Sequence, residues 1–423
     1  MAKLLIKGGT VVAEGKSRKV DVLVADGKIE AIGESLMADE TTEVFDAEGC
    51  VVTYGLADVH VHLREPGYSA KETIATGTRA AAHGGVTTVC SMPNLQPAPD
   101  APETIAIEQQ MIDEQAVIEV RPFATISKGR ARRELAEIEA LRPLSVGYSD
   151  DGNGIQTEAM MREAMQRIAA VDGIIAAHCE DDSLLHAGYI HDGDYARQHG
   201  HKGICSESEW GPIKRDVKLA EEEGCRYHAC HISTKESVEI IRTAKAHCNH
   251  ISCETAPHYL VLCDADLKEE GRFKMNPPLR AAEDRAALIE GIKDGTIEVI
   301  ATDHAPHTAE EKSRGLKESA MGIVGIETSF AICYTHLVRK GVITIEKLIA
   351  LMSENPRRIF RLGGAMQVGE RADIAVFDIT KPYTIDTNEF QSMGKATPFE
   401  GEKVYGRCVL TLFNGEKVWS ENK

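Results

Sequence analysis

The middle of the chain alternates between short apolar runs and longer segments in which apolar residues recur with the period of a helix. The apolar runs are rich in β-branched residues, as buried strands are. Strands are expected at residues 56–63, 86–92, 117–126, 145–149, 173–179, 226–232, 250–256 and 298–303. Helical patterns lie at residues 72–85, 104–115, 130–141, 158–170, 214–224, 236–248 and 282–295. Because strand and helix alternate about eight times, the pattern predicts an α/β fold with a parallel (β/α)8 barrel of the TIM type.

The two ends of the chain have a different pattern. Short β-branched runs broken by glycine-containing turns lie at residues 4–12, 20–33, 43–52, 372–380 and 408–419. Asp-Gly and Asn-Gly pairs between such runs favour hairpins. We therefore expect one small β-sandwich module built from both termini. The predicted division is residues 1–53 for its N-terminal part, 54–365 for the barrel and 366–423 for its C-terminal part.

Composition and charge narrow the possible functions. The chain has 423 residues and a formal net charge of −18, which argues against nucleic acid as a partner. No run approaches the roughly 18–20 apolar residues of a membrane span, and the start has no apolar signal segment. The eleven cysteines form no Cys-x-x-Cys pair and are expected to be reduced thiols. These features predict a cytoplasmic protein that binds neither nucleic acid nor membrane.

Metal-binding residue types stand at the ends of the predicted barrel strands. His60 and His62 are two residues apart on one strand, so their side chains share a face and can share a metal ion. Since strand ends meet at one face of a barrel, the remaining groups should join them there. The candidates are His178, His231, Asp303 and a carboxylate from either Asp150 or Asp151. Imidazole with carboxylate favours one or two Zn²⁺ ions, with Mn²⁺, Co²⁺ or Fe²⁺ as alternatives.

A series of motifs in a fixed order carries a family resemblance. DVHVHLREPG, SMPN, SDDG, AHCE, CHIS, MNPPLR and TDHAPH follow one another between Asp58 and His307. In these motifs the chain resembles the class I dihydroorotases of the amidohydrolase superfamily. The resemblance implies that His60, His62 and Asp303 hold one zinc ion and that His178 and His231 hold the other. It further implies that Asp151 bridges them, where related enzymes use a carbamylated lysine; Asp150 stays the alternative.

The resemblance also implies a substrate and a reaction. The expected activity is the reversible cyclisation of N-carbamoyl-L-aspartate to L-dihydroorotate plus water, in de novo pyrimidine (UMP) biosynthesis. A hydroxide between the metals would act as nucleophile, with Asp303 as general acid and base. Arg64 and Asn94 match the groups that bind the substrate carboxylate, since a guanidinium grips a carboxylate in bidentate fashion. The other implied contacts are Asn276, His307 and the backbone of Met321 and Gly322. A homodimer stays open, and so does association with aspartate transcarbamoylase, with which some relatives assemble.

Two alternative functions fit these motifs less well. Allantoinases and dihydropyrimidinases generally use a carbamylated lysine, which the SDDG motif lacks, and Arg64 favours a substrate with a carboxylate. An inactive scaffold protein would typically have lost ligand histidines, and all the expected ones are present here.

Residues 305–320, with Lys312, Arg314 and Lys317, are either a lid over the site or a solvated loop.

Overall fold

The chain forms a mixed α/β structure in the computed structural model, which describes residues 3–421. Two parallel sheets lie in its middle. One has three strands in the order β10 (Glu119–Pro122), β9 (Val86–Ser91) and β8 (Leu56–Val61). The other has four strands in the order β11 (Ile174–Ala177), β14 (Arg226–Ala229), β15 (Ile251–Thr255) and β16 (Val299–Ile300).

Single parallel bridges connect these two sheets into a closed order. Ala124 bridges Tyr148, which also bridges Ile175, so the segment around Tyr148 lies between β10 and β11. On the other side Val61 bridges His304, which lies four residues beyond the end of β16. The expected strand at 145–149 is therefore present only as an irregular segment with isolated bridges. Because all these pairings are parallel, the carboxyl ends of the strands lie on one side of the molecule.

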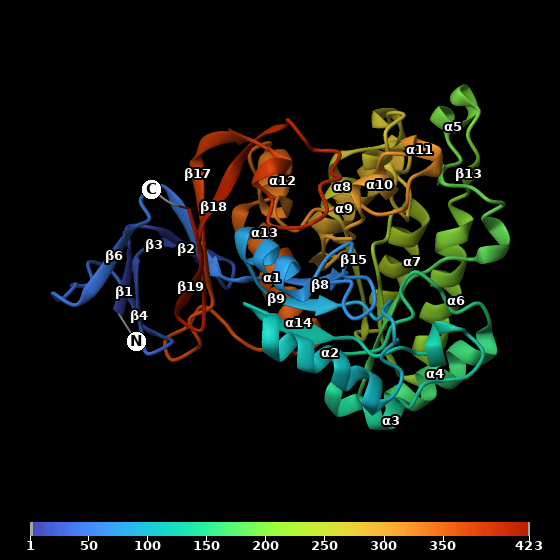
Figure 1. Ribbon diagram of the computed structural model, residues 1–423, viewed down its shortest axis with the longest axis horizontal. Coiled ribbons are helices and arrows are strands. Elements are labelled where there is room, and N and C mark those ends of the chain that lie inside the picture. The colour runs from blue at the N-terminus through green and yellow to red at the C-terminus, as the bar shows by residue number, and fades with distance from the viewer. Residues whose placement is uncertain (1–2, 422–423) are drawn as a thin grey trace.

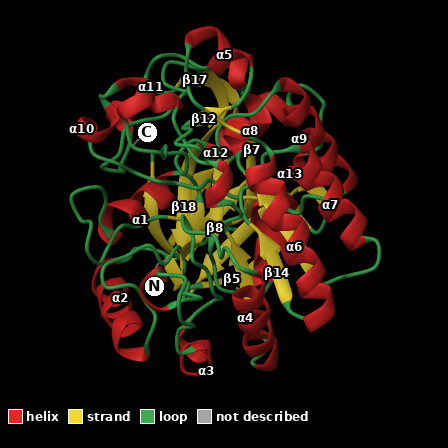
Figure 2. Cartoon of the chain, turned by 90° about the vertical axis from the view of Figure 1, so that its right-hand side faces the viewer, coloured by secondary structure: helices red, strands yellow, loops and turns green. Residues whose placement is uncertain are grey.

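Helices cover the outside of the parallel strands (Figure 2). The long ones are α1 (Ile74–His83), α2 (Pro102–Gln115), α4 (Glu158–Ala170), α6 (Glu207–Glu223), α7 (Lys235–Lys245) and α9 (Ala282–Asp294). Thr73, Thr157 and Thr234 each begin one of these helices by accepting a hydrogen bond from a backbone N–H of its first turn. The shorter helices are α5 (Asp194–His199), α8 (Pro257–Val261), α12 (Ser329–Cys333), α13 (Ile345–Ile349) and α14 (Asn355–Phe360).

The predicted helix at 130–141 is mostly wrong. Only α3 (Ile138–Leu141) is α-helical there. The chain before it folds back on itself, because the Lys128 N–H donates to the Glu134 carbonyl oxygen at 2.9 Å. Arg130 and Arg132 take up left-handed backbone conformations, with φ of 54° and 58°. A tight turn therefore replaces the predicted helix. Ser127, at the start of this turn, donates a hydrogen bond to Asp150.

Both ends of the chain contribute to a separate group of antiparallel and mixed strands (Figure 1). One sheet has the order β5-β4-β1-β6 and the other β19-β18-β17-β7-β2-β3. Their bounds are β1 (Lys3–Lys7), β2 (Thr10–Ala13), β3 (Lys16–Lys19), β4 (Asp21–Ala25), β5 (Lys28–Gly33), β6 (Thr42–Asp46), β7 (Cys50–Tyr54), β17 (Ile374–Thr384), β18 (Lys403–Phe413) and β19 (Glu416–Ser420). Leu4 and Ile6 from the first sheet share one buried apolar cluster with Val376 and Leu410 from the second. Burial of this shared cluster holds the two sheets together.

The C-terminal segment also reaches the carboxyl ends of the parallel strands. The Val324 N–H donates to the Ala396 carbonyl oxygen at 3.0 Å, and Ser392 donates to the buried Glu72. The segment that the sequence leaves as either a lid or a solvated loop contains α10 (Ala309–Lys312) and α11 (Gly315–Glu318). A short parallel pair, β12 (Ile190–His191) and β13 (Gly203–Ile204), stands beside it. Among residues 3–421, no helix combines the length and the apolar character needed to cross a membrane.

Candidate metal centre and active site

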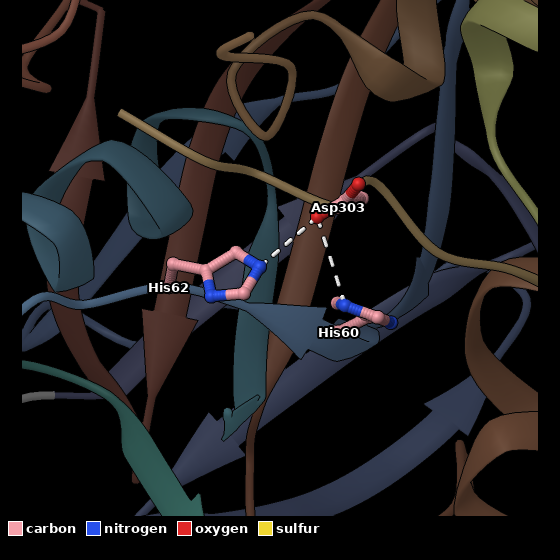
Figure 3. Close-up of side chains that lie close together, drawn as sticks. All are labelled: His60, His62 and Asp303. Atoms are coloured by element: carbon pink, nitrogen blue, oxygen red, sulfur yellow. Dashed lines mark hydrogen bonds and ion pairs between the residues drawn. The ribbon is translucent and has the colours of Figure 1, made fainter. Parts of the chain in front are cut away.

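Two histidines of β8 and its extension face an aspartate that follows β16 (Figure 3). The His62 Nε2 atom lies 3.0 Å from Asp303 Oδ1, and His60 Nε2 lies 3.6 Å from the same oxygen. All three side chains are buried. The alternation of side chains along a strand explains why both imidazoles reach one point, since the intervening Val61 turns into the apolar core.

Asp151 lies at the centre of the whole group. Its Oδ1 atom is 3.3 Å from His60 Nε2, 3.6 Å from His178 Nδ1 and 3.7 Å from His231 Nε2. Its Oδ2 atom is 3.6 Å from His62 Nε2. Burial raises the pKa of the Asp151 carboxyl, but His60 and the other imidazoles outweigh it and hold the pKa well below its usual range. The structure thus brings all six predicted ligands together around an ionised carboxylate.

Asp150 points away from this group. Its Oδ1 atom accepts hydrogen bonds from the backbone N–H groups of Ile126 and Ser127, at 2.9 and 3.1 Å, and its Oδ2 accepts from the Ser127 hydroxyl. These partners belong to the tight turn that replaces the predicted helix. The structure therefore separates the two adjacent aspartates: Asp151 faces the histidines and Asp150 holds the neighbouring loop.

Three residues of the site have left-handed backbone conformations although none is glycine. The φ angles are 65° at Arg64, 34° at His231 and 49° at Asp303. Such conformations cost on the order of 1–3 kcal/mol each and persist only where surrounding contacts impose them. Each of these residues comes just after a strand, so the turn of the backbone redirects its side chain toward the shared centre.

Hydrogen bonds to the far side of two imidazoles fix their orientation. His60 Nδ1 lies 2.6 Å from Glu254 Oε1, and His62 Nδ1 lies 2.8 Å from Asn94 Oδ1. Since carboxylate and amide oxygens only accept, Nδ1 carries a proton in both rings, and each Nε2 faces the centre. Glu254 was not predicted from the sequence. Its only signal there is a single charged residue within the buried strand β15 (Ile251–Thr255).

The residues fit a bound metal. Among the described residues, His60 Nε2 and Asp151 Oδ1 are buried atoms without a hydrogen-bond partner. Three groups of described residues have ligand atoms close enough for one ion: His60 with His62 and Asp303, His60 with Asp151 and His231, and His60 with Cys230 and Glu254. His178 Nδ1 and His231 Nε2 also face each other at 2.9 Å. Buried imidazole and carboxylate groups of this kind are the ligands that zinc prefers. The unpaired nitrogen and oxygen atoms of these side chains therefore converge at a point where a cation would satisfy them.

Replacing Glu254 with glutamine should weaken metal binding by about 10–100-fold, as loss of a group that orients a ligand typically does. The amide would support His60 less strongly than the carboxylate, which lies 2.6 Å from the ring. Chelator competition measures the affinity. Glu108→Gln is the matched control: this glutamate is equally buried, bonds Ser91 and has a pKa raised by burial to about 8. Equal metal affinity in the two variants would contradict the role of Glu254.

A second group of predicted residues lies beside the histidines. The Arg64 side chain is 8% exposed, and its Nε–H donates to the Pro306 carbonyl oxygen at 3.1 Å. Burial lowers the pKa of Arg64 to about 10, so the guanidinium is still charged at neutral pH. Its Nη2 atom is 3.5 Å from His307 Nε2, which in turn lies 2.8 Å from the Met321 carbonyl oxygen. Burial and the nearby Arg64 lower the pKa of His307 to about 3, which leaves its imidazole neutral.

The remaining predicted contacts lie on two connected segments. Asn276 Nδ2 donates to Glu180 Oε1 at 2.9 Å, which leaves the amide oxygen of Asn276 for another partner. Gly322 has a φ of 132°, and an added Cβ would lie 3.0 Å from His307 Nε2. Glycine at this position therefore allows the backbone to lie against the imidazole.

Lys312 connects the segment before Asn276 with the segment around Gly322. Its Nζ donates to the carbonyl oxygens of Lys274, Ala320 and Gly322, at 3.1, 2.7 and 2.6 Å. Burial, together with the charge of Lys274, lowers the pKa of Lys312 to about 7. The sequence alone suggested a solvated or mobile lysine in this loop, whereas the structure buries it. Movement of residues 305–320 as a lid stays a prediction.

Comparison with known proteins agrees with this geometry. The family model described as "Dihydro-orotase-like" matches residues 49–237. A dihydroorotase of Geobacillus sp. (strain WCH70) is 47% identical over 426 residues, covering 100% of both chains. A dihydroorotase of Listeria innocua serovar 6a is 48% identical over 99% of both. The chain belongs to the dihydroorotase family.

Solved structures show how far the family's architecture extends. The L-hydantoinase (dihydropyrimidinase) from Arthrobacter aurescens superposes with a TM-score of 0.89 at 26% identity, covering 100% of this chain and 97% of that one. The dihydropyrimidinase from Brevibacillus agri NCHU1002 gives 0.86 at 25% identity, covering 99% and 95%. The fold, including both terminal segments, is thus shared with cyclic-amide hydrolases that carry other names.

Proposed function

We propose that this chain is a dihydroorotase, which interconverts N-carbamoyl-L-aspartate and L-dihydroorotate plus water in pyrimidine biosynthesis. The observation that carries the proposal is the position of Arg64, a buried and charged guanidinium beside the cluster of histidines and aspartates. A neutral ring substrate would leave this charge uncompensated at a cost in free energy. The α-carboxylate of dihydroorotate supplies the missing partner.

We propose zinc as the metal, with one or two ions per chain and two favoured. His60, His62 and Asp303 would hold one ion, His178 and His231 the other, and Asp151 both. A zinc ion bound there would lower the pKa of a water molecule and polarise the amide carbonyl of the substrate. The support for this assignment is the donor chemistry and the unpaired buried atoms of the cluster.

The residues of the chain itself orient the substrate and move the proton. Arg64 binds the carboxylate, with Asn94 and the neutral His307 beside it, while Asn276 and the backbone of Met321 and Gly322 contact the ring. In the hydrolytic direction, Asp303 accepts a proton from the attacking water and delivers it to the ring nitrogen as the amide C–N bond breaks. In the reverse direction the ureido nitrogen attacks the protonated β-carboxyl group, and Asp303 takes the proton from that nitrogen and delivers it to the departing hydroxyl, which leaves as water.

We also propose an architecture for this enzyme. The parallel strands form a (β/α)8 barrel of the TIM type over residues 54–365, and the closed order of bridges around Tyr148 and His304 supports this interpretation. Residues 1–53 and 366–423 form one β-sandwich module, supported by their shared buried cluster. A homodimer and association with aspartate transcarbamoylase stay predictions.

The substrate assignment is tested by a rate comparison on one purified, zinc-loaded sample. Hydrolysis of dihydroorotate is measured beside that of dihydrouracil, hydantoin and allantoin, with the zinc content determined on the same sample. We expect dihydroorotate to be hydrolysed with the highest kcat/KM. Activity on dihydrouracil or hydantoin without activity on dihydroorotate would instead place the chain with its hydantoinase-like structural neighbours.

Replacing Arg64 with lysine should lower kcat/KM for dihydroorotate by about 10–100-fold, as expected for losing a hydrogen bond to a charged group. Lysine keeps the charge but cannot form the bidentate pair, so the zinc content should not change. Arg132→Lys, outside the cluster and paired with Asp182 at 2.6 Å, is the control. Unchanged kinetics in Arg64→Lys would remove the support for a carboxylate-bearing substrate.

A further inference from the structure

A cavity lies at the amino ends of the parallel strands, away from the histidine cluster. Its volume is about 920 Å³. It is bordered by α2, by β10, by the first residue of β14, by Arg371 before β17 and by Phe413 of β18. Five arginines line it: Arg121, Arg142, Arg226, Arg361 and Arg371. In a chain with a net charge of −18, such a concentration of positive charge needs an explanation.

At one end of the cavity the positive charges are balanced. Glu119 forms ion pairs with Arg121 at 2.5 Å and with Arg371 at 2.7 Å. Arg371 also pairs with the buried Asp373. Two guanidinium groups thus face two carboxylates. The lining residue Asp113, on α2, is exposed and accepts a hydrogen bond from Gln109.

At the other end three arginines share a single carboxylate, that of Asp172. Arg361 pairs with it, the Nη2 atom lying 3.1 Å from Oδ1. Arg142 bonds only carbonyl oxygens there, those of Val171 at 3.0 Å and Asp172 at 3.1 Å. Arg226 has one hydrogen bond in the described part of the chain, to the Ile359 carbonyl oxygen.

Chain connectivity explains why these three side chains meet. Arg226 pairs with Ile174 in the parallel sheet, and Ile174 follows Asp172 by two residues. Burial lowers the pKa of the Arg226 guanidinium, and the positive charges of Arg361 and Arg142 lower it further. At this end of the cavity three positive charges against one negative charge leave a surplus of two, and most N–H donors of Arg226 have no acceptor among the described residues.

We propose that this cavity binds the phosphate group of a small organic phosphate, such as a nucleoside monophosphate. A phosphate monoester carries close to two negative charges at neutral pH, which matches the surplus, and guanidinium groups bind its oxygens in bidentate fashion. The rest of the cavity suits an organic portion. Ile112 and Leu362 are apolar lining residues, and the Arg371 guanidinium lies 4.8 Å from the centre of the Phe413 ring, forming a flat surface.

Calorimetric titration of the zinc-loaded full chain with UMP, AMP, inorganic phosphate and uridine tests the proposal. Saturating dihydroorotate keeps the catalytic site filled during a parallel set of titrations. We expect both monophosphates to bind in either condition, inorganic phosphate to bind more weakly, and uridine not to bind. Arg226→Gln should raise the dissociation constant at least about tenfold. Arg361→Gln should act in the same direction, and since its side chain is half exposed it serves if Arg226→Gln fails to fold.

Arg18→Gln, an exposed change on β3 far from the cavity, is the matched control and should bind like the unaltered chain. Two results would overturn the proposal. One is the absence of binding by either monophosphate at millimolar concentration. The other is binding that dihydroorotate displaces and that Arg64→Lys weakens while Arg226→Gln and Arg361→Gln do not, which would locate the anion in the catalytic site.

Discussion

Replacing Asp303 with asparagine is expected to lower kcat for dihydroorotate hydrolysis by about 10²–10⁴-fold, the usual contribution of a general acid–base group. Asparagine has the same shape but cannot accept and return a proton. Asp303 lies 3.0 Å from His62 Nε2 and is buried, so no solvent-exposed group replaces it. The measurement is steady-state kinetics on protein reloaded with zinc, with the metal content determined on the same sample.

The pH profile separates this role from simple ligation. Burial raises the pKa of Asp303, but His62 and the neighbouring histidines outweigh it and lower the pKa below the ordinary carboxyl value. With Asp303 as the base, activity falls as the pH drops and this carboxylate is protonated, and that acidic limb should disappear in Asp303→Asn. A zinc-loaded variant with kcat within threefold of the unaltered enzyme, or with the same acidic limb, would show that another group moves the proton.

Replacing each of the two adjacent aspartates with alanine should affect different properties: Asp151→Ala the bound zinc, and Asp150→Ala the stability of the fold. Asp151→Ala is expected to lose at least half of the bound zinc and to lower kcat by more than about 10³-fold, because it removes the carboxylate on which four histidines converge. Asp150→Ala is expected to retain zinc but to lower the free energy of unfolding by at least about 2 kcal/mol. It leaves the N–H groups of Ile126 and Ser127 without their acceptor.

Each aspartate variant is the control for the other. Zinc content by elemental analysis and urea unfolding of both proteins complete the comparison. Loss of zinc from Asp150→Ala, with zinc retained in Asp151→Ala, would reverse the assignment. Loss of zinc from both at equal stability would mean that the neighbouring loop, and not Asp151 itself, controls the metal site.

Much of the site follows from local rules that a sequence displays. His60 and His62 had to share a face because side chains alternate along a strand. His178, His231 and Asp303 could be expected beside them because each stands at the end of a predicted parallel strand. The helix expected at 130–141 is mostly absent because contacts distant in sequence outweigh the local preference. The apolar spacing is helical, but hydrogen bonds to Asp150 and within the turn fix another conformation.

The sequence by itself determined the kinds of residue at the strand ends, their order along the chain and the β-strand character of both termini. Only the tertiary structure decided which of Asp150 and Asp151 faces the histidines, that Glu254 supports His60, and that Lys312 is buried beneath the Gly322 segment. The physical reason is the distance over which each rule acts. Side-chain alternation and turn formation depend on neighbours in sequence, whereas these three outcomes depend on backbone angles at strand ends and on partners that only folding brings near.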